Sequence, residues 1–134
     1  MGFPGGSGRR EQSDRRCPVV SKVLVIEDDQ DILGLLARHL RDMGHEVVLA
    51  HTGELGVDLA RADPPDVVVV DIVLPGKDGR WVIRELRADP RTRHCQVVVT
   101  SMLDPGDIRV DDVDVMLLKP FDRAAVWAAL GSVS

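Results

Sequence analysis

The sequence has few aromatic residues and few cysteines. Its 134 residues include two Phe, two Trp and no Tyr, and the only cysteines are Cys17 and Cys95. This is too little for a disulfide framework, so we expect a reducing, cytoplasmic environment. The apolar runs are far shorter than the roughly 20 residues of a membrane span, and the first residues lack the apolar stretch of a secretory signal. We therefore expect no membrane association.

Acidic residues outnumber basic ones outside the first 22 residues. The net charge of the chain is −5, while residues 1–22 carry +3, which leaves −8 for the remainder. We expect residues 1–20 to form a flexible basic leader, with a basic tail for an acidic partner or nucleic acid as the alternative. The folded part has no basic patch with interleaved aromatics, so we expect no direct binding to nucleic acid.

What the sequence does contain is a regular alternation of apolar strands and amphipathic helices. Extended, apolar segments predict five strands, at residues 22–26, 45–50, 66–71, 96–100 and 113–118. Apolar residues at helical spacing predict helices from residue 31 to Gly44, from Thr52 to residue 63, from about residue 80 to Asp89, and from Asp122 to Leu130. Strands that are apolar throughout and alternate with helices are typical of a parallel sheet covered on both faces. We therefore expect one α/β doubly wound domain over residues 21–131, followed by a tail at 132–134.

Polar residues follow four of the predicted strands. They are Glu27, Asp28 and Asp29 after the first strand, Asp71 at the end of the third, Thr100 and Ser101 after the fourth, and Lys119 after the fifth. Each alone is more common as a cap, a strand residue or a solvated charge. In a doubly wound sheet, however, the carboxyl ends of the strands form the ligand site, so these residues are expected to converge.

Such a convergence has a specific chemistry. Several carboxylates at one edge repel each other unless a cation joins them, and Mg²⁺ suits a site of carboxylates, waters and phosphate oxygens. A carboxylate can itself be the nucleophile in phosphoryl transfer. The Thr100 hydroxyl and the Lys119 ammonium can each bind a phosphoryl oxygen. The pattern therefore predicts that Asp71 is a Mg²⁺-dependent phosphoryl acceptor.

The motifs also resemble a known family. Val25-Ile26-Glu27-Asp28-Asp29, Asp71-Ile72-Val73-Leu74-Pro75-Gly76-Lys77-Asp78-Gly79, Thr100-Ser101 and Lys119-Pro120-Phe121 stand in the order found in receiver domains of two-component response regulators. The resemblance covers about residues 20–131. It implies the flavodoxin-like strand order 2-1-3-4-5 and phosphorylation of Asp71.

The resemblance also implies roles for individual residues. Glu27 and Asp28 would be the acidic pair, with Asp28 binding Mg²⁺ directly and Glu27 acting mainly through water. The Ile72 carbonyl would be a further ligand beside Asp71, with the Val73 carbonyl as the alternative.

Four more residues receive roles by the same resemblance. Thr100 would turn toward the phosphoryl group, with the small Ser101 beside it. Lys119 would pair with the phosphate. Asp29 is expected to be a helix cap or an outer charge. The four histidines lack ligand spacing, and Met102, Met116 and Trp127 are expected to serve packing.

The sequence departs from the family pattern between Thr100 and Lys119. This segment is shorter than usual, and Pro105-Gly106 with scattered acids makes a poor helix, so we expect the fourth helix to be short or irregular. Met116 stands where the family has a switch aromatic. Val73 and Met102 stand where hydrolysis is tuned, and both are apolar, which predicts slow loss of the phosphoryl group.

These features favour a single-domain response regulator. It would accept a phosphoryl group from a histidine kinase or histidine phosphotransfer protein and then bind an unknown downstream protein. We expect no turnover on a free substrate. The alternative is a receiver-fold interaction scaffold that works without phosphorylation. A haloacid-type phosphohydrolase, suggested by Asp112-Val113-Asp114, is disfavoured because these residues do not follow a clean apolar strand.

Overall fold

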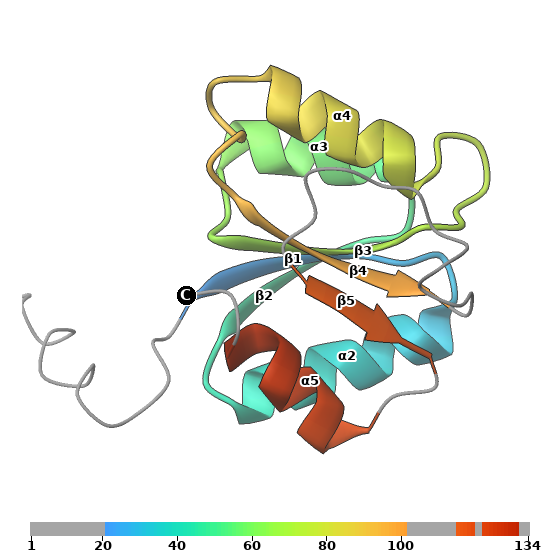
Figure 1. Cartoon of the computed structure of the whole chain (residues 1–134), viewed down its shortest axis with the longest axis vertical. Helices are drawn as coiled ribbons and strands as arrows, with labels where there is room; N and C mark the ends of the chain where they lie inside the picture. The colour runs from blue at the N-terminus through green and yellow to red at the C-terminus, as the bar shows by residue number, and fades with distance from the viewer. Residues whose placement is uncertain (1–20, 102–114, 120–121, 132–134) are drawn as a thin grey trace, which may run out of the picture.

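A computed structural model describes residues 21–101, 115–119 and 122–131 (Figure 1). The basic leader, the tail, the expected irregular fourth helix, Met102 and Asp112-Val113-Asp114 all lie outside these residues. Cys17 does too. In the described part of the chain, no helix is long and apolar enough to cross a membrane.

Five strands form one parallel sheet. They are β1 (Lys22–Ile26), β2 (Glu46–Ala50), β3 (Val67–Asp71), β4 (Gln96–Ser101) and β5 (Val115–Leu118). Their order across the sheet is β2-β1-β3-β4-β5, and every neighbouring pair is parallel. The predicted doubly wound topology with order 2-1-3-4-5 is therefore confirmed. The predicted bounds of β1 to β4 differ from the observed ones by one residue or less, and β5 ends at Leu118 as predicted, while its predicted start at residue 113 lies outside the described residues.

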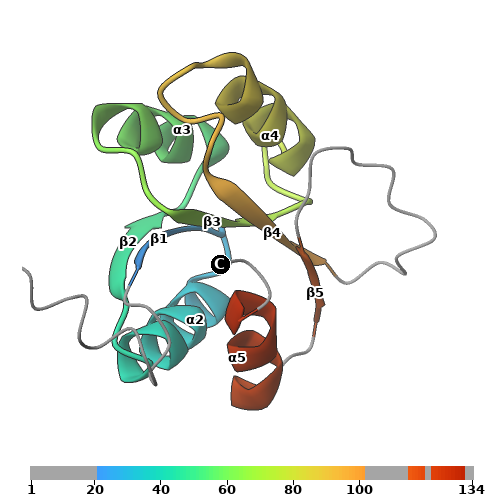
Figure 2. The same ribbon diagram turned by 60° about the vertical axis from the view of Figure 1, so that its left-hand side comes forward.

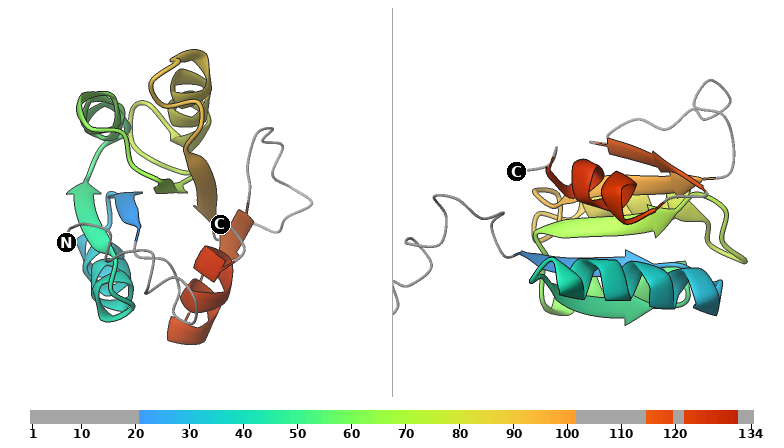
Figure 3. Two further views of the ribbon diagram at one scale, coloured as in Figure 1. Left: turned by 90° about the vertical axis from the view of Figure 1, so that its left-hand side faces the viewer. Right: turned by 90° about the horizontal axis from the view of Figure 1, so that it is seen from below.

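Helices cover both faces of the sheet. In the described residues they are α2 (Gln30–Asp42), α3 (Gly53–Ala62), α4 (Gly79–Ala88) and α5 (Arg123–Gly131). Helices α3 and α4 lie side by side on one face, and α2 and α5 lie on the other, as the turned views also show (Figures 2 and 3). Parallel neighbours need such crossovers, which is why each strand is separated from the next by a helix or a long segment.

Strand residues alternate between the two helical layers. Val68 and Val70 of β3 belong to the core under α3 and α4, whereas Val67 and Val69 belong to the core under α2 and α5. All four valines are at most 4% exposed, so β3 is buried on both faces. Burying an aliphatic side chain of this size stabilises the fold by about 1.5–3 kcal/mol. The central strand that ends on Asp71 is thus among the most firmly held parts of the domain.

The helix boundaries follow from short polar caps. Asp29, Thr52 and Asp78 each accept a hydrogen bond from a backbone N–H in the first turn of α2, α3 and α4. Asp122 does the same for α5, whose Ala125 N–H it accepts at 2.9 Å. Asp29 is therefore the helix cap that the sequence predicted. Gly44, with φ of 94°, ends α2 in the left-handed region that favours glycine.

One packing prediction is wrong. Trp127 of α5 was expected to be a packing residue, but 47% of it is exposed. Helix α5 buries Val126 and Ala129 against the sheet, and Trp127 is not among the residues packed in that core. The helix is apolar nearly all round, which is why sequence pattern alone did not distinguish its buried face.

Candidate functional site

Asp71 is held at the end of the central strand. It pairs with Thr100 in the β3–β4 register, and the next residue, Ile72, donates its N–H to the Thr100 carbonyl at 3.1 Å. Asp71 is only 6% exposed. Its Oδ1 accepts the Val73 backbone N–H at 3.1 Å. One oxygen of the carboxylate is therefore oriented by the chain that immediately follows it.

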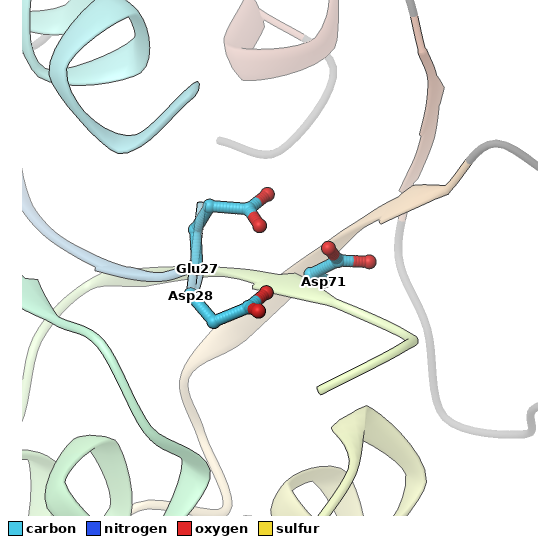
Figure 4. A group of neighbouring side chains, drawn as sticks. All are labelled: Glu27, Asp28 and Asp71. Atoms are coloured by element: carbon cyan, nitrogen blue, oxygen red, sulfur yellow. The ribbon is translucent and has the colours of Figure 1, made fainter. Parts of the chain in front are cut away.

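Glu27 and Asp28 extend from the end of the adjacent strand, β1. The Glu27 N–H donates to the Ala50 carbonyl at 3.0 Å, so this residue continues the pairing of β1 with β2. Glu27 is 1% exposed, whereas Asp28 is exposed. One carboxylate oxygen from each of Glu27, Asp28 and Asp71 lies within 4.8 Å of the others. Figure 4 shows the three side chains gathered where β1 and β3 end.

Lys119 joins two of these carboxylates. Its Nζ lies 2.8 Å from Oε1 of Glu27 and 2.8 Å from Oδ2 of Asp71, and its side chain is 7% exposed. Burial alone would lower the pKa of this ammonium, but its hydrogen bonds to Asp71 and Glu27 outweigh that effect and raise the pKa. The lysine therefore stays charged and neutralises part of the acidic cluster.

Glu27 is the carboxyl group whose charge is most costly here. Its pKa is raised to about 7, because burial and the neighbouring Asp71 carboxylate together outweigh the hydrogen bond from Lys119, which lowers it. A carboxylate that is held in this way, beside two others, is stabilised by any additional cation. The three carboxylates of the cluster thus carry more negative charge than the single Lys119 ammonium neutralises.

Thr100 and Ser101 lie where the sequence predicted, at the end of β4. Both are buried, at 1% and 0% exposed. Thr100 is the register partner of Asp71 on one side and of Leu117 on the other. The parallel register therefore brings the Thr100 hydroxyl, the Asp71 carboxylate and the strand that leads to Lys119 to one edge of the sheet.

The loop after Asp71 bears on the choice of backbone ligand. The Ile72 carbonyl accepts the Gly79 N–H at 3.0 Å, and Ile72 is fully buried. Val73, by contrast, is 63% exposed. The Ile72 carbonyl retains a second lone pair, so the choice between the Ile72 and Val73 carbonyls as the backbone ligand stays a prediction.

The donor set fits a hard divalent cation. It consists of carboxylate oxygens from two strand ends, one of them exposed and so accessible to water, with a backbone carbonyl close by. Mg²⁺ prefers such oxygen ligands and keeps several waters. Among the described residues, no other group of acids, cysteines or histidines meets the same criterion. None of the four histidines, all of which lie in the described part of the chain, belongs to this group.

The structure also describes Met116, the residue that stands at the position of the switch aromatic. Met116 lies on β5 and packs, partly buried, against the core under α3 and α4. Leu117 belongs to the opposite core, under α2 and α5. Met116 therefore faces the other side of the sheet from the strand positions that lead to the acidic cluster.

Two features of the site were not anticipated from the sequence. One is the backbone N–H of Val73 on Asp71, and the other is the direct ion pairing of Lys119 with both Glu27 and Asp71. The alternation of strand side chains contains part of the signal. Val25, Val69, Val98 and Leu117 all face α2 and α5, and each site residue Glu27, Asp71, Thr100 and Lys119 follows one of them by two positions.

The chain is similar to known proteins. Residues 23–130 match the family model described as the response regulator receiver domain. The response regulator PleD of Caulobacter vibrioides is 32% identical over 118 residues, which are 85% of this chain but only 26% of PleD. Protein PilH of Pseudomonas aeruginosa is 30% identical over 118 residues, covering 85% of this chain and 98% of PilH. The chain thus spans about a quarter of one relative and nearly all of the other.

Solved structures show the same fold. The chemotaxis response regulator CheY4 of Vibrio cholerae superposes with a TM-score of 0.82 at 22% identity, covering 86% of this chain and 99% of CheY4. The receiver domain of a sensor histidine kinase from Pseudomonas aeruginosa superposes with a TM-score of 0.78 at 25% identity, covering 85% and 97%. That structure has a magnesium ion coordinated in its active-site cleft.

Proposed function

The chain belongs to the response regulator receiver domain family, and from that premise we propose that it accepts a phosphoryl group on Asp71 in a Mg²⁺-dependent reaction. The donor is a phosphohistidine of a histidine kinase or of a histidine phosphotransfer protein. The modified domain then changes its contacts with a downstream protein.

The single observation that carries this proposal is the environment of Asp71. Its carboxylate is buried, yet it touches a buried ammonium, lies within 4.8 Å of two further carboxylates, and occupies the carboxyl end of the central strand. A purely structural ion pair needs one acid for one lysine. Three acids around one lysine leave an excess of negative charge that a bound cation and a phosphoryl group would engage together.

The transfer step is simple in its bond changes. One oxygen of the Asp71 carboxylate forms a new P–O bond to the phosphorus atom. The P–N bond of the donor breaks, and its electron pair stays on the imidazole nitrogen. The Val73 N–H holds one carboxylate oxygen in place before the transfer. Lys119, which is already at Asp71, binds an oxygen of the incoming group, and the Thr100 hydroxyl binds another.

Asp28, Asp71 and a backbone carbonyl of Ile72 or Val73 would hold the magnesium ion, with Glu27 acting through water. When bound, the ion offsets the negative charge that gathers on the transferred group. Asp28 is exposed, so an ion from solvent can reach its carboxylate directly. Glu27 is buried, and its carboxyl group adds to the negative charge beside the ion. The receiver domain of the Pseudomonas sensor kinase supports this assignment, because magnesium is coordinated in its cleft.

The proposal extends to the setting of the reaction. A domain that is modified once and then binds a partner has no turnover on a free substrate, so we do not expect a conventional enzyme. Cys95 is free and buried, and burial raises the pKa of its thiol to about 11. A thiol kept protonated in this way is unreactive, so we expect no role for Cys95 in the reaction.

The proposal is tested by phosphorylation with acetyl phosphate in the presence of Mg²⁺. The wild-type chain should gain one phosphoryl group, seen as the mass increase of one PO₃H unit and as a base-labile product. Asp71→Asn should gain none, because the amide cannot attack the phosphorus atom. Removing Mg²⁺ with a chelator should abolish the gain in the wild type.

Asp29→Asn is the matched control. Asp29 lies next to the acidic pair, but its side chain caps α2, and asparagine caps a helix equally well. This variant should be phosphorylated like the wild type. Modification of Asp71→Asn to the same extent as the wild type would overturn the proposal.

A second candidate function is an interaction scaffold that works without phosphorylation. Met116 favours it, because this flexible, partly buried side chain stands where the family has its switch aromatic. The discriminating measurement is partner capture by the unmodified chain and by the phosphorylated chain. Equal capture would favour the scaffold, and capture that depends on phosphorylation would favour the switch.

A further inference from the structure

Two helix N-termini in this fold approach the loop after Asp71 at distances that leave no room for a side chain. The loop, residues 72–78, connects the phosphoacceptor strand to α4. Helix α4 begins at Gly79, and helix α3 begins at Gly53. A Cβ on either residue would overlap the loop or the strand end, as the distances below show.

Gly79 packs on the backbone of Asp71 itself. An ideal Cβ at Gly79 would lie 2.4 Å from the Asp71 carbonyl oxygen and 2.7 Å from the Ile72 Cα. The Gly79 N–H also donates to the Ile72 carbonyl at 3.0 Å. The atoms that would clash belong to the backbone at the end of β3. The clash could therefore be relieved only by moving the backbone, and not by rotating a side chain.

Gly53 packs farther along the same loop. An ideal Cβ there would lie 2.6 Å from the Lys77 carbonyl oxygen and 2.9 Å from a methyl group of Val82. Lys77 is six positions after Asp71, and its ammonium lies over the Trp81 ring, 5.5 Å from the centroid. The contact of Gly53 therefore holds the far end of the loop against α3 and α4. It does not touch the backbone that carries the Asp71 carboxylate.

Backbone conformation does not explain either glycine. The left-handed glycines of the described chain are Gly44 and Gly76. Gly53 and Gly79 do not have a φ in that region, so alanine could adopt their backbone conformation. Alanine would also be the better helix former. What requires glycine at these two positions is the close approach to the loop.

We propose that Gly79 is a positioning residue for phosphoryl transfer at Asp71. This inference rests on the proposed function, since it concerns the same carboxylate. The contact of Gly79 with the Asp71 and Ile72 backbone sets the start of the loop. The start of the loop in turn places the Val73 N–H on Oδ1 of Asp71. With Oδ1 fixed there and Oδ2 on Lys119, the carboxylate has one orientation toward the acidic pair.

The chain offers a graded set of variants to test this. Gly79→Ala displaces the backbone of Asp71. Gly53→Ala has a similarly tight backbone contact, but at Lys77. Gly34→Ala, in α2, meets nothing within 4 Å, so it adds a methyl group without a contact.

The rate of phosphorylation by acetyl phosphate with Mg²⁺ should follow that order. Because small misplacements of a reacting group carry large rate penalties, Gly79→Ala should lose about tenfold to 100-fold. Gly53→Ala should lose less than Gly79→Ala, and Gly34→Ala should match the wild type. Equal rates for Gly79→Ala and the wild type would overturn the proposal.

A spectroscopic measurement separates positioning from general destabilisation. In ¹H–¹⁵N spectra recorded without phosphodonor, the Val73 amide proton of the wild type should resonate downfield, because it is hydrogen-bonded to the Asp71 carboxylate. In Gly79→Ala it should move upfield, and in Gly53→Ala it should keep its wild-type position. An unchanged Val73 amide in folded Gly79→Ala would contradict the proposal.

A measurement on the wild type covers the case in which Gly79→Ala does not fold. The Gly79 amide should be protected from hydrogen exchange to the same degree as the amides of β3, because it is bonded to Ile72. Exchange as fast as that of exposed loop amides would overturn the proposal. If the wild type takes no phosphoryl group, the proposed function fails, while the Val73 and Gly79 amides still decide whether Gly79 orients Asp71.

Discussion

The side-chain nitrogen of Lys119 lies 2.8 Å from Oδ2 of Asp71, although 48 residues separate the two in sequence. The same nitrogen reaches Glu27, 92 residues away. The site is therefore joined by a single ammonium that contacts the ends of two other strands. Removing or weakening that contact should affect both stability and phosphoryl transfer.

Lys119→Met should lower the free energy of unfolding by about 3 kcal/mol, because it leaves buried carboxylates without their cation. Phosphorylation by acetyl phosphate should also slow. Mg²⁺ should then raise the melting temperature of the variant more than that of the wild type, because the ion no longer shares the carboxylates with an ammonium. Thermal unfolding with and without Mg²⁺ measures this, and an equal or smaller shift in the variant would count against it.

Asp28→Asn should weaken Mg²⁺ binding by about tenfold or more, since it removes the charge of an exposed ligand from the cluster. Stability should change little without the ion, because the side chain is exposed. Calorimetric titration with Mg²⁺ gives the affinity. Asp29→Asn serves as the control, since its carboxylate caps α2. If both variants bound Mg²⁺ as the wild type does, Asp28 would not be a ligand.

Thr100→Ser should retain phosphorylation, whereas Thr100→Val should slow it severalfold. Both replacements fit a buried site beside Asp71, but only serine keeps a hydroxyl for the phosphoryl oxygen. The stability of either variant should stay within about 1.5 kcal/mol of the wild type, the usual worth of one hydrogen bond. The rate is followed by intact mass, and identical rates for Ser and Val would remove the hydroxyl from the reaction.

Val73→Asn should shorten the lifetime of the phosphorylated chain severalfold. The Val73 side chain is 63% exposed beside a buried carboxylate, so an apolar group there keeps water from approaching in an ordered way, and an amide would bind it. Decay of the mass increase after removal of phosphodonor gives the lifetime. An unchanged lifetime would show that Val73 does not slow the hydrolysis of the phosphoryl group.

His45 should destabilise the fold as pH decreases below about 6.5, whereas Glu27, whose raised pKa favours proton uptake by the folded chain, acts in the opposite direction. Burial lowers the pKa of His45, and its Nδ1 accepts the Ser21 N–H at 3.1 Å, which requires the neutral ring. Below the unfolded pKa of 6.5 the unfolded chain takes up a proton that the folded chain resists, so the unfolded state gains stability as pH falls. His45→Asn keeps an acceptor but does not titrate. In denaturant unfolding, lowering the pH from 7.5 to 5.5 should therefore destabilise this variant less than the wild type, and an equal change in both would exclude His45 as a cause.

Much of the fold could be predicted from local pattern. Apolar strands such as 67–70 have few alternatives in a chain with intervening amphipathic helices, and caps such as Asp29 and Asp122 act within three residues. The buried face of α5 could not be predicted, because a helix that is apolar nearly all round gives no periodic signal. For that reason the sequence did not predict that Trp127 is exposed.

The sequence alone determined which residues stand at the carboxyl ends of the strands, because strand length and alternation are local properties. Asp71, Glu27, Asp28, Thr100 and Lys119 all followed from that. Only the tertiary structure decided their contacts: that Lys119 joins Glu27 to Asp71, that Val73 donates to the carboxylate, and that Gly79 packs on its backbone. These contacts depend on strand order, register and the approach of α4, which are set by packing between residues far apart in the chain. No local pattern contains that information.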